Sequence, residues 1–326
     1  MKIVFHGENA ANFRPDIETW LSGSHTIRLL SDDLSEAGAE QMFNDAEIII
    51  GTALSKNHSS LQNARLYQVA GAGYDGIDFS CLPPACCVCN CFGHEDAITE
   101  YVMAALLSRY VPLREADANL RRGDWRHTAG RPAGLRRECS GSSIGLLGYG
   151  HIGRAVAQRA KAFNMEVHVA NRSQVGVGDV VDYYYPLSSV SNFFGAVDVL
   201  VIALPLTDST IGFVDKQAFA AMRTDTLVIN VGRGQVVEEE ALYEALKEKK
   251  IGAAVIDTWY VYPQDTISSS LPGNLPFHEL DNIIITPHMS GWTWGTIRRR
   301  QQLIAENIRR LSKGEPLLNI VHGPER

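Results

Sequence analysis

The sequence lacks long apolar runs and an excess of positive charge. No apolar stretch approaches the roughly 18 residues of a membrane span, and the apolar run near the N-terminus, residues 3–5, is too short for the hydrophobic part of a signal peptide. The formal net charge of the 326 residues is −7, which argues against a nucleic-acid-binding surface. We therefore expect a soluble cytoplasmic protein without a membrane or nucleic-acid partner.

Paired C-x2-C spacing, the usual mark of a zinc site, is also missing. Five of the six cysteines cluster at residues 81–91, and Cys139 stands apart. Disulfide frameworks are rare in cytosolic proteins. Cys87, Cys89 and Cys91 alternate, as residues on one face of a strand do, and buried free cysteine packs like a small apolar residue. We predict core positions for this cluster and no metal site; zinc binding is the alternative.

Short apolar runs alternate with helical patterns along the chain, which favours parallel sheets. The length suggests about two domains. A first doubly wound α/β unit ends near residue 92, and a second runs from about 95 to 290. The expected elements of the first unit are strands at 2–5, 26–30, 47–51 and 66–69 and helices at 13–21 and 35–44.

The stretch from Ser143 to Phe163 joins a strand to a helix through three glycines with G-x-G-x-x-G spacing. An apolar run precedes the glycines, and helical periodicity follows them. This context is the fingerprint of a dinucleotide site, in which glycine backbone approaches the pyrophosphate and the helix N-terminus offers N–H donors. An ordinary strand-to-helix turn is the alternative. The predicted contacts are Gly148, Tyr149, Gly150, His151, Ile152 and Gly153.

Two charged residues directly follow strands of the second unit. Arg233 follows the strand at 226–231, and His288 follows the apolar run at 283–286. Because ligands in open α/β sheets bind at the carboxyl ends of strands, we expect both side chains beside the nicotinamide end of a dinucleotide. An arginine there can bind a carboxylate bidentately. A histidine can exchange the alcohol proton while a hydride moves.

Several ordered stretches of the chain match one family. They are Gly71 to Asp78, Gly148 to Gly153, Leu204 to Thr207, Asn230 to Leu242, Asp257, and Thr286 to His288 with Gly291. In these stretches the chain resembles the D-isomer-specific 2-hydroxyacid dehydrogenases. The resemblance implies a Rossmann cofactor domain, residues 95–289, inserted into a flavodoxin-like substrate domain, residues 1–94 plus 290–326. It also implies an active site in the cleft between them and a homodimer to which the excursion near residues 110–140 contributes.

The resemblance further assigns roles to single residues. Arg233 would bind the substrate carboxylate, and His288 would be the general acid/base. The glycine-rich loop at 70–78 would bind the carboxylate through the N–H groups of Ala72 and Gly73, although a plain turn would have a similar sequence. Residues that would complete the substrate site are Tyr74 and Trp292, unless they only pack. Further cofactor contacts would be Leu204, Pro205, Val231, Gly232, Gly291 and Asp257, the last orienting the nicotinamide carboxamide.

The chain departs from the family pattern at Tyr262. The family usually has a glutamate at this position, five residues after Asp257, where it pairs with the histidine. A tyrosine hydroxyl can orient the His288 ring but has no charge at neutral pH, whereas a carboxylate raises the pKa of a neighbouring histidine. We therefore predict that reductive activity falls at a lower pH than in members with glutamate. The alternative is that Tyr262 only packs and the site is weak or inactive.

A second departure concerns the cofactor. Members that use NAD carry an aspartate at the end of the second Rossmann strand, where this chain has Asn171, followed by Arg172 and Ser173. Loss of the carboxylate removes repulsion toward a 2′-phosphate, and Arg172 can pair with that phosphate. We predict that NADP is preferred over NAD; an exposed loop charge is the alternative for Arg172.

The sequence thus predicts an NAD(P)H-dependent oxidoreductase that reduces the keto carbon of a small 2-keto acid, such as glyoxylate or hydroxypyruvate, to a D-2-hydroxy acid. Phosphite and formate are disfavoured as substrates, because the corresponding family branches have lysine at Ala72 and glutamine at Tyr262. The rival hypothesis is a dinucleotide-sensing protein of the same fold with little catalytic activity. Tyr262 supports this rival, whereas Arg233 and His288 oppose it.

Overall fold

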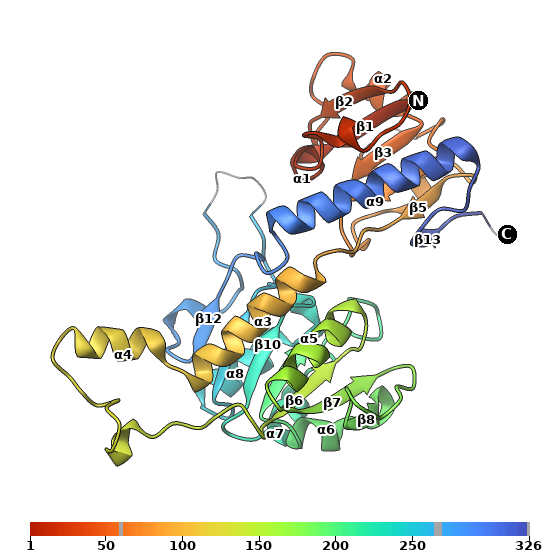
Figure 1. Ribbon diagram of the computed structural model, residues 1–326. Coiled ribbons are helices and arrows are strands. Elements are labelled where there is room, and N and C mark those ends of the chain that lie inside the picture. Colours follow the sequence, from red (N-terminus) through yellow and green to blue (C-terminus); the bar gives the residue numbers. More distant parts are fainter. Residues whose placement is uncertain (59–60, 264–268, 325–326) are drawn as a thin grey trace. The chain divides into compact units, whose positions relative to one another are not determined.

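The computed structural model describes residues 1–58, 61–263 and 269–324. The chain divides into two compact units, unit 1 with Met1–His94 and Trp292–Arg326 and unit 2 with Glu95–Gly291 (Figure 1). Each unit is an α/β domain with its own sheet, so the predicted fold class is confirmed. Unit 2 ends two residues beyond the expected boundary at 289. Within the described ranges, no helix has the length and apolarity needed to cross a membrane.

Unit 1 is built on a sheet with the strand order β13-β5-β4-β3-β1-β2. Its strands pair in parallel except β13, which is antiparallel to β5. The first five strands of the chain lie side by side in the spatial order β2-β1-β3-β4-β5, which is that of a flavodoxin-like fold. The elements are β1 (Lys2–His6), α1 (Gly7–Ala11), η1 (Ile17–Thr19), β2 (Thr26–Leu30), α2 (Ala39–Asn44), β3 (Ile48–Gly51), β4 (Leu66–Val69), η2 (Phe79–Cys81), β5 (Cys87–Cys89), α9 (Trp294–Lys313) and β13 (Ile320–His322).

Alternating side chains of these strands face two separate apolar layers. Ile3 and Phe5 pack with α1 and α9 on one face, whereas Val4 packs with α2 on the other. This is the period of two expected of a strand that is buried on both sides. Figure 1 shows both chain termini in this unit, because α9 returns to it after unit 2.

The predicted helix at 13–21 is wrong. Only the 3-10 turn η1 forms there, and Asp16 before it has a left-handed backbone with φ 57°. Pro15 directly before Asp16 has no N–H to continue a helix from residues 12–14. Phe13 and Ile17 are nevertheless fully buried. The spacing of Phe13 and Ile17 therefore reflects burial of both side chains in the core of unit 1 and does not indicate a helix.

The cysteine cluster lies largely in the core of unit 1. Cys86, Cys89 and Cys91 are buried, as predicted, whereas Cys81 and Cys87 are half-buried; all are free thiols. Burial raises the pKa of the Cys86, Cys89 and Cys91 thiols to about 12, which makes them poor nucleophiles and metal ligands at neutral pH. In the part of the chain that the structure describes, no group of three or more His, Cys, Asp and Glu residues is placed to bind a metal ion.

Unit 2 is built on a fully parallel sheet with the order β12-β11-β10-β9-β6-β7-β8. Its elements are α3 (Glu95–Tyr110), α4 (Leu113–Leu120), η3 (Pro132–Gly134), β6 (Ser143–Leu147), α5 (His151–Ala162), β7 (Glu166–Asn171), β8 (Tyr183–Pro186), η4 (Leu187–Ser189), α6 (Ser191–Gly195), β9 (Val199–Ile202), α7 (Lys216–Ala221), β10 (Leu227–Asn230), η5 (Gly234–Val236), α8 (Glu239–Lys247), β11 (Ala253–Ile256), η6 (Phe277–Glu279) and β12 (Ile283–Ile285).

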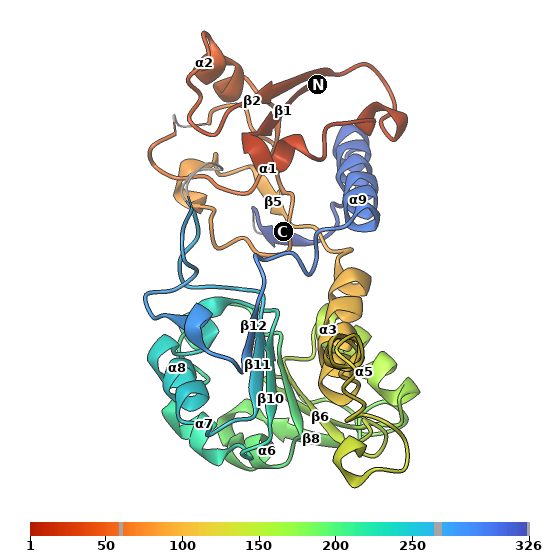
Figure 2. The ribbon, with the colours of Figure 1, turned by 90° about the vertical axis from the view of Figure 1, so that its left-hand side faces the viewer.

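Helices cover both faces of this sheet. Figure 2 shows α3 and α5 on one face and α7 and α8 on the other, and each pair has its own apolar cluster against the strands. The strand order reverses between β6 and β9, which is the topological switch point of a Rossmann fold. Since all strands are parallel, their carboxyl ends share one edge of the sheet, and this edge carries the candidate site.

Candidate active site

The glycine loop after β6 has the geometry of a phosphate cradle. Gly148 has φ 101°, and a Cβ atom there would lie 2.9 Å from the carbonyl oxygen of Ala203. A Cβ at Gly153 would collide with the carbonyl of Gly148, so the helix approaches the loop closely. At Gly150, the N-cap of α5, a Cβ would meet nothing within 4 Å. The loop is thus closed on its protein side and open where the α5 N–H groups point, which fits a pyrophosphate.

The end of β7 is tied to this loop by Asn171. Its side-chain oxygen accepts a hydrogen bond from the Tyr149 N–H at 3.2 Å, and its amide nitrogen donates to the Ser173 carbonyl at 2.9 Å. Arg172, between them in sequence, is exposed. The loop that would meet a ribose is therefore shaped by a neutral amide, with a cationic side chain next to it.

Arg233 follows β10 in a tightly braced turn. The Asn230 side chain accepts from the Gly232 N–H at 3.0 Å and donates to the Arg233 carbonyl at 3.1 Å. A Cβ at Gly232 would lie 2.8 Å from the carbonyl oxygen of Leu204, so the chain after β9, with Leu204 and Pro205, runs against this turn. Arg233 itself is half-buried. Its guanidinium is thereby presented from a rigid support.

His288 follows β12 and is exposed, with a left-handed backbone of φ 57°. Its Nδ1 atom lies 3.0 Å from the hydroxyl oxygen of Tyr262. The backbone N–H of Trp259 donates to the same hydroxyl at 3.1 Å. Tyr262, at the position where the family pattern has a glutamate, thus contacts the His288 ring, and it is itself held by the backbone that follows β11.

Asp257, at the end of β11, is fully buried and holds the loop of His288. Its Oδ1 atom accepts from the Thr286 hydroxyl at 2.6 Å and from the Met289 N–H at 2.9 Å. Its Oδ2 atom accepts from the Ser290 N–H at 2.9 Å. A carboxylate has about four acceptor positions, so these three donors are compatible with the predicted contact to a carboxamide.

Two residues at this edge were not found by sequence reasoning. Thr286 was recognised only as part of a motif, and Tyr101 lies among the apolar side chains of α3, where it packs against the apolar cluster of that face. The Tyr101 hydroxyl oxygen lies 2.6 Å from Oγ1 of Thr286, and the Trp259 indole N–H donates to the Thr286 carbonyl at 2.7 Å. The helical spacing of Tyr101 gives no signal for a polar contact with a residue 185 positions away.

The predicted substrate residues Ala72, Gly73, Tyr74 and Trp292 lie in unit 1. The Ala72 carbonyl accepts from the Asn90 side chain at 2.7 Å, which fixes the loop after β4. The Tyr74 side chain is 43% exposed, and that of Trp292 is 47% exposed with its ring edge-on to Phe13. The remaining site residues follow strands of unit 2, at the edge of its sheet where the carboxyl ends of the strands lie. They are the glycine loop, residues 171–173, Leu204, Pro205, Val231 to Arg233, Asp257, Tyr262, His288 and Gly291.

A profile of the D-isomer specific 2-hydroxyacid dehydrogenase NAD binding domain matches residues 103–290. The chain belongs to the D-isomer-specific 2-hydroxyacid dehydrogenase family. The match covers the glycine loop, Arg233 and His288 and ends one residue before Gly291.

Relatives within the family have several different names. The chain is 30% identical to a D-3-phosphoglycerate dehydrogenase of Archaeoglobus fulgidus over 95% of its own length and 55% of the relative's, so it spans about half of that protein. It is 32% identical to a glyoxylate/hydroxypyruvate reductase of Arabidopsis thaliana over 81% of this chain and 80% of the relative. The crystal structure of the NADPH-dependent glyoxylate/hydroxypyruvate reductase of Sinorhizobium meliloti, in complex with NADP and malonate, has a TM-score of 0.77 at 22% identity and covers 100% of this chain and 98% of that one, which shows a shared fold.

Proposed function

We propose that this family member is an NADP(H)-preferring reductase that converts a small 2-keto acid to a D-2-hydroxy acid. The observation that carries the proposal is the common sheet edge of Arg233 and His288, which follow β10 and β12 beside a glycine loop that fits a pyrophosphate. Two strand spacings place their strand ends about 10 Å apart. A bound substrate with a carboxylate and a keto group can meet both side chains across that distance.

In the proposed reduction, each residue of the site has a separate role. A bound reduced nicotinamide would supply the hydride. The Arg233 guanidinium binds the substrate carboxylate and polarises the neighbouring carbonyl. His288 donates a proton from Nε2 to the carbonyl oxygen as negative charge develops there. The Tyr262 hydroxyl at Nδ1 keeps the ring turned so that Nε2 faces the substrate.

The preference for NADP rests on the end of β7. Asn171 places a neutral amide where an aspartate would repel a 2′-phosphate, and the exposed Arg172 supplies a cation next to it. The Sinorhizobium meliloti reductase with the same fold is described as NADPH-dependent, which is consistent with this assignment.

We also propose that the protein acts as a cytoplasmic homodimer. The six free cysteines are compatible with a reducing compartment. The arm, residues 113–137, carries strongly exposed leucines in unit 2, as a subunit contact would.

A direct test is NADPH oxidation, followed by absorbance, with a panel that includes glyoxylate, hydroxypyruvate, pyruvate and larger 2-keto acids. We expect turnover with at least one of them, and D-configuration in every product that has a stereocentre, which glycolate from glyoxylate does not. The His288→Gln variant should lose about 10²–10⁴-fold in kcat, the usual contribution of a general acid. Binding of NADPH by this variant, measured by fluorescence, should be unchanged.

The rival function is a dinucleotide sensor. It predicts tight NADPH binding, no turnover across the panel and no effect of His288→Gln on any measured property. Tyr262 was its main support, but the 3.0 Å contact between the Tyr262 hydroxyl and the His288 ring nitrogen can orient the ring for proton transfer.

A further inference from the structure

The loop that carries His288 is held in a conformation that costs energy. A left-handed backbone is unfavourable at a residue other than glycine, and His288 has φ 57°. The two amides that follow His288, those of Met289 and Ser290, both donate to the Asp257 carboxylate. The position of this loop backbone therefore depends on the position of the carboxylate. Contacts that hold the carboxylate also hold the backbone that carries His288.

The orientation of Asp257 depends on Thr286. The Thr286 hydroxyl has one proton, and the charged Oδ1 atom of Asp257 at 2.6 Å is the strongest acceptor near it. With that proton committed to Asp257, the 2.6 Å contact between Tyr101 and Thr286 requires the Tyr101 hydroxyl to be the donor. The result is a directed chain from the Tyr101 O–H to Oγ1 of Thr286 and from the Thr286 O–H to Asp257.

The environment of this chain strengthens it. Asp257 is fully buried, and Tyr101 and Thr286 are half-buried, so the bonds lie in a medium of low dielectric where chained donors polarise one another. Burial and the charge of Asp257 raise the pKa of Tyr101 to about 12. The Tyr101 hydroxyl therefore remains a donor at every pH at which the protein works.

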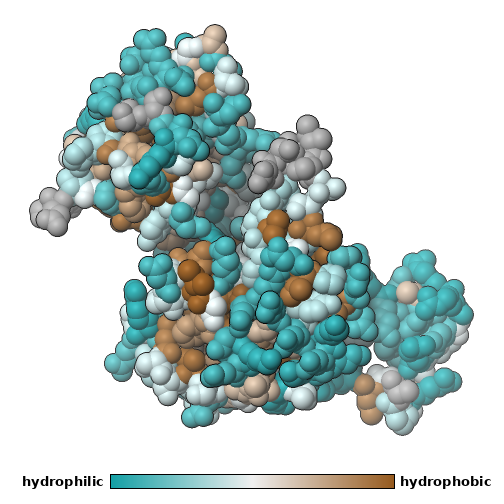
Figure 3. All heavy atoms as spheres, turned by 180° about the vertical axis from the view of Figure 1, so that it is seen from behind, coloured by the Kyte–Doolittle hydropathy of each residue, from teal (hydrophilic) through white to brown (hydrophobic). Residues whose placement is uncertain are grey.

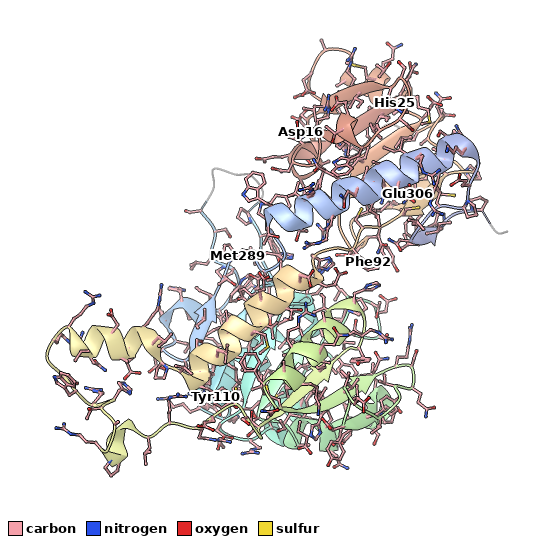
Figure 4. The ribbon with its side chains drawn as sticks, viewed as in Figure 1. Asp16, His25, Phe92, Tyr110, Met289 and Glu306 are labelled. Atoms are coloured by element: carbon pink, nitrogen blue, oxygen red, sulfur yellow. The ribbon has the colours of Figure 1, made fainter. Side chains whose placement is uncertain are left out.

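We infer that Tyr101, on helix α3, is a positioning residue for the proton donor His288, acting through Thr286 and Asp257. This inference rests on the proposed function only for its effect on turnover. Its structural content, that α3 supports the 286–290 loop through one phenolic hydroxyl, stands independently. Tyr110, labelled in Figure 4, is the last residue of α3, nine positions after Tyr101, and it supplies a matched control.

The test compares Tyr101→Phe with Tyr110→Phe. Tyr101→Phe removes only the hydroxyl, so we expect kcat for 2-keto-acid reduction to fall about tenfold, as for one lost hydrogen bond to a charged network, with KM for NADPH unchanged. Because the pKa of Tyr101 is far above the assay range, the loss should be the same at every pH. Tyr110→Phe should change neither kcat nor KM.

Amide hydrogen exchange of residues 286–291, measured without substrate, separates this inference from the proposed function. Tyr101→Phe should speed exchange at Met289 and Ser290 about tenfold, and Tyr110→Phe should not. If no keto acid turns over but exchange responds, the loop support stands and the proposed function fails. Unchanged exchange in Tyr101→Phe, or faster exchange with an unchanged kcat in an active enzyme, would overturn the positioning role.

A second pair of variants tests the same chain of hydrogen bonds at Thr286, so the inference remains testable if Tyr101→Phe does not fold. Thr286→Val removes the hydroxyl at nearly constant volume and should reproduce both the faster exchange and the lower kcat. Thr286→Ser keeps the hydroxyl and should restore most of both. Equal behaviour of the valine and serine variants would contradict the directed chain.

Discussion

At the scale of single residues, the proposed mechanism makes the pH dependence of the reaction a consequence of the contact between Tyr262 and His288. In the proposed mechanism, reduction requires a protonated His288, so its rate falls as the pH rises through the pKa of this group. Tyr262 is neutral at working pH and adds no charge beside the imidazolium. A carboxylate at the same position stabilises the imidazolium and raises the pKa by about one unit or more.

We therefore predict that Tyr262→Glu moves the falling limb of the reductive pH–rate profile upward by about one pH unit. Tyr262→Phe, which removes the hydroxyl without adding charge, should lower kcat and leave the limb without an upward shift. The measurement is kcat/KM for the keto acid between pH 5 and 10. A limb that stays at the same pH in Tyr262→Glu would show that this position does not act on the protonation of His288.

Arg172 is the second residue whose charge has a measurable consequence. A charge-assisted pair between Arg172 and a 2′-phosphate would contribute about 1.5–3 kcal/mol. Arg172→Ala should therefore lower kcat/KM with NADPH about 10- to 100-fold and leave the value with NADH within about threefold. Arg159→Ala is a matched control, because it removes one arginine charge from α5, where Arg159 pairs with Asp96 at 2.9 Å. A parent enzyme that prefers NADH would refute the assignment.

At the scale of elements, the sequence predicts those strands, turns and helices whose conformation depends on interactions between residues close in the chain. The strand, glycine turn and helix around Gly148 were predictable, because the conformation of each part follows from its own residues. The strands that end before Arg233 and His288 were predictable too, since short continuous apolar runs favour strands of a parallel sheet. β10 is buried on both faces, whereas Ile284 and Ile285 of the edge strand β12 are exposed.

Elements whose formation depends on residues far away in the sequence were not predicted correctly. The short strand β13 exists because residues 320–322 pair with β5, more than 200 residues earlier. The predicted helix at 13–21 failed because burial of Phe13 and Ile17 imitates helical spacing. The link from Tyr101 to Thr286 joins residues 185 positions apart, and a tyrosine in an apolar stripe has the same pattern whether or not its hydroxyl is used.

At the scale of the whole molecule, the arm, residues 113–137, has large apolar side chains that are exposed to solvent, as expected of a surface that binds a partner. The Leu113 side chain is 73% exposed, that of Leu120 is 50%, that of Trp125 is 60% and that of Leu135 is 84%. In Figure 3 the arm projects at the right of unit 2, with apolar atoms among hydrophilic ones. Large apolar side chains gathered on one projecting segment are typical of an interaction surface, whereas scattered ones are not.

We predict that the protein is a homodimer in solution and that the arm contributes to its interface. Leu120→Glu combined with Leu135→Glu places two carboxylates in that interface and should shift the species at micromolar concentration from dimer to monomer, because burying unpaired charge is costly. Sedimentation equilibrium or light scattering measures the mass. Leu29→Glu is the control, since Leu29 lies in β2 of unit 1 and its side chain is 53% exposed. This variant should remain dimeric. A monomeric parent protein, or a double variant that stays dimeric, would exclude the arm as the subunit contact, and the exposed leucines would then require a different partner.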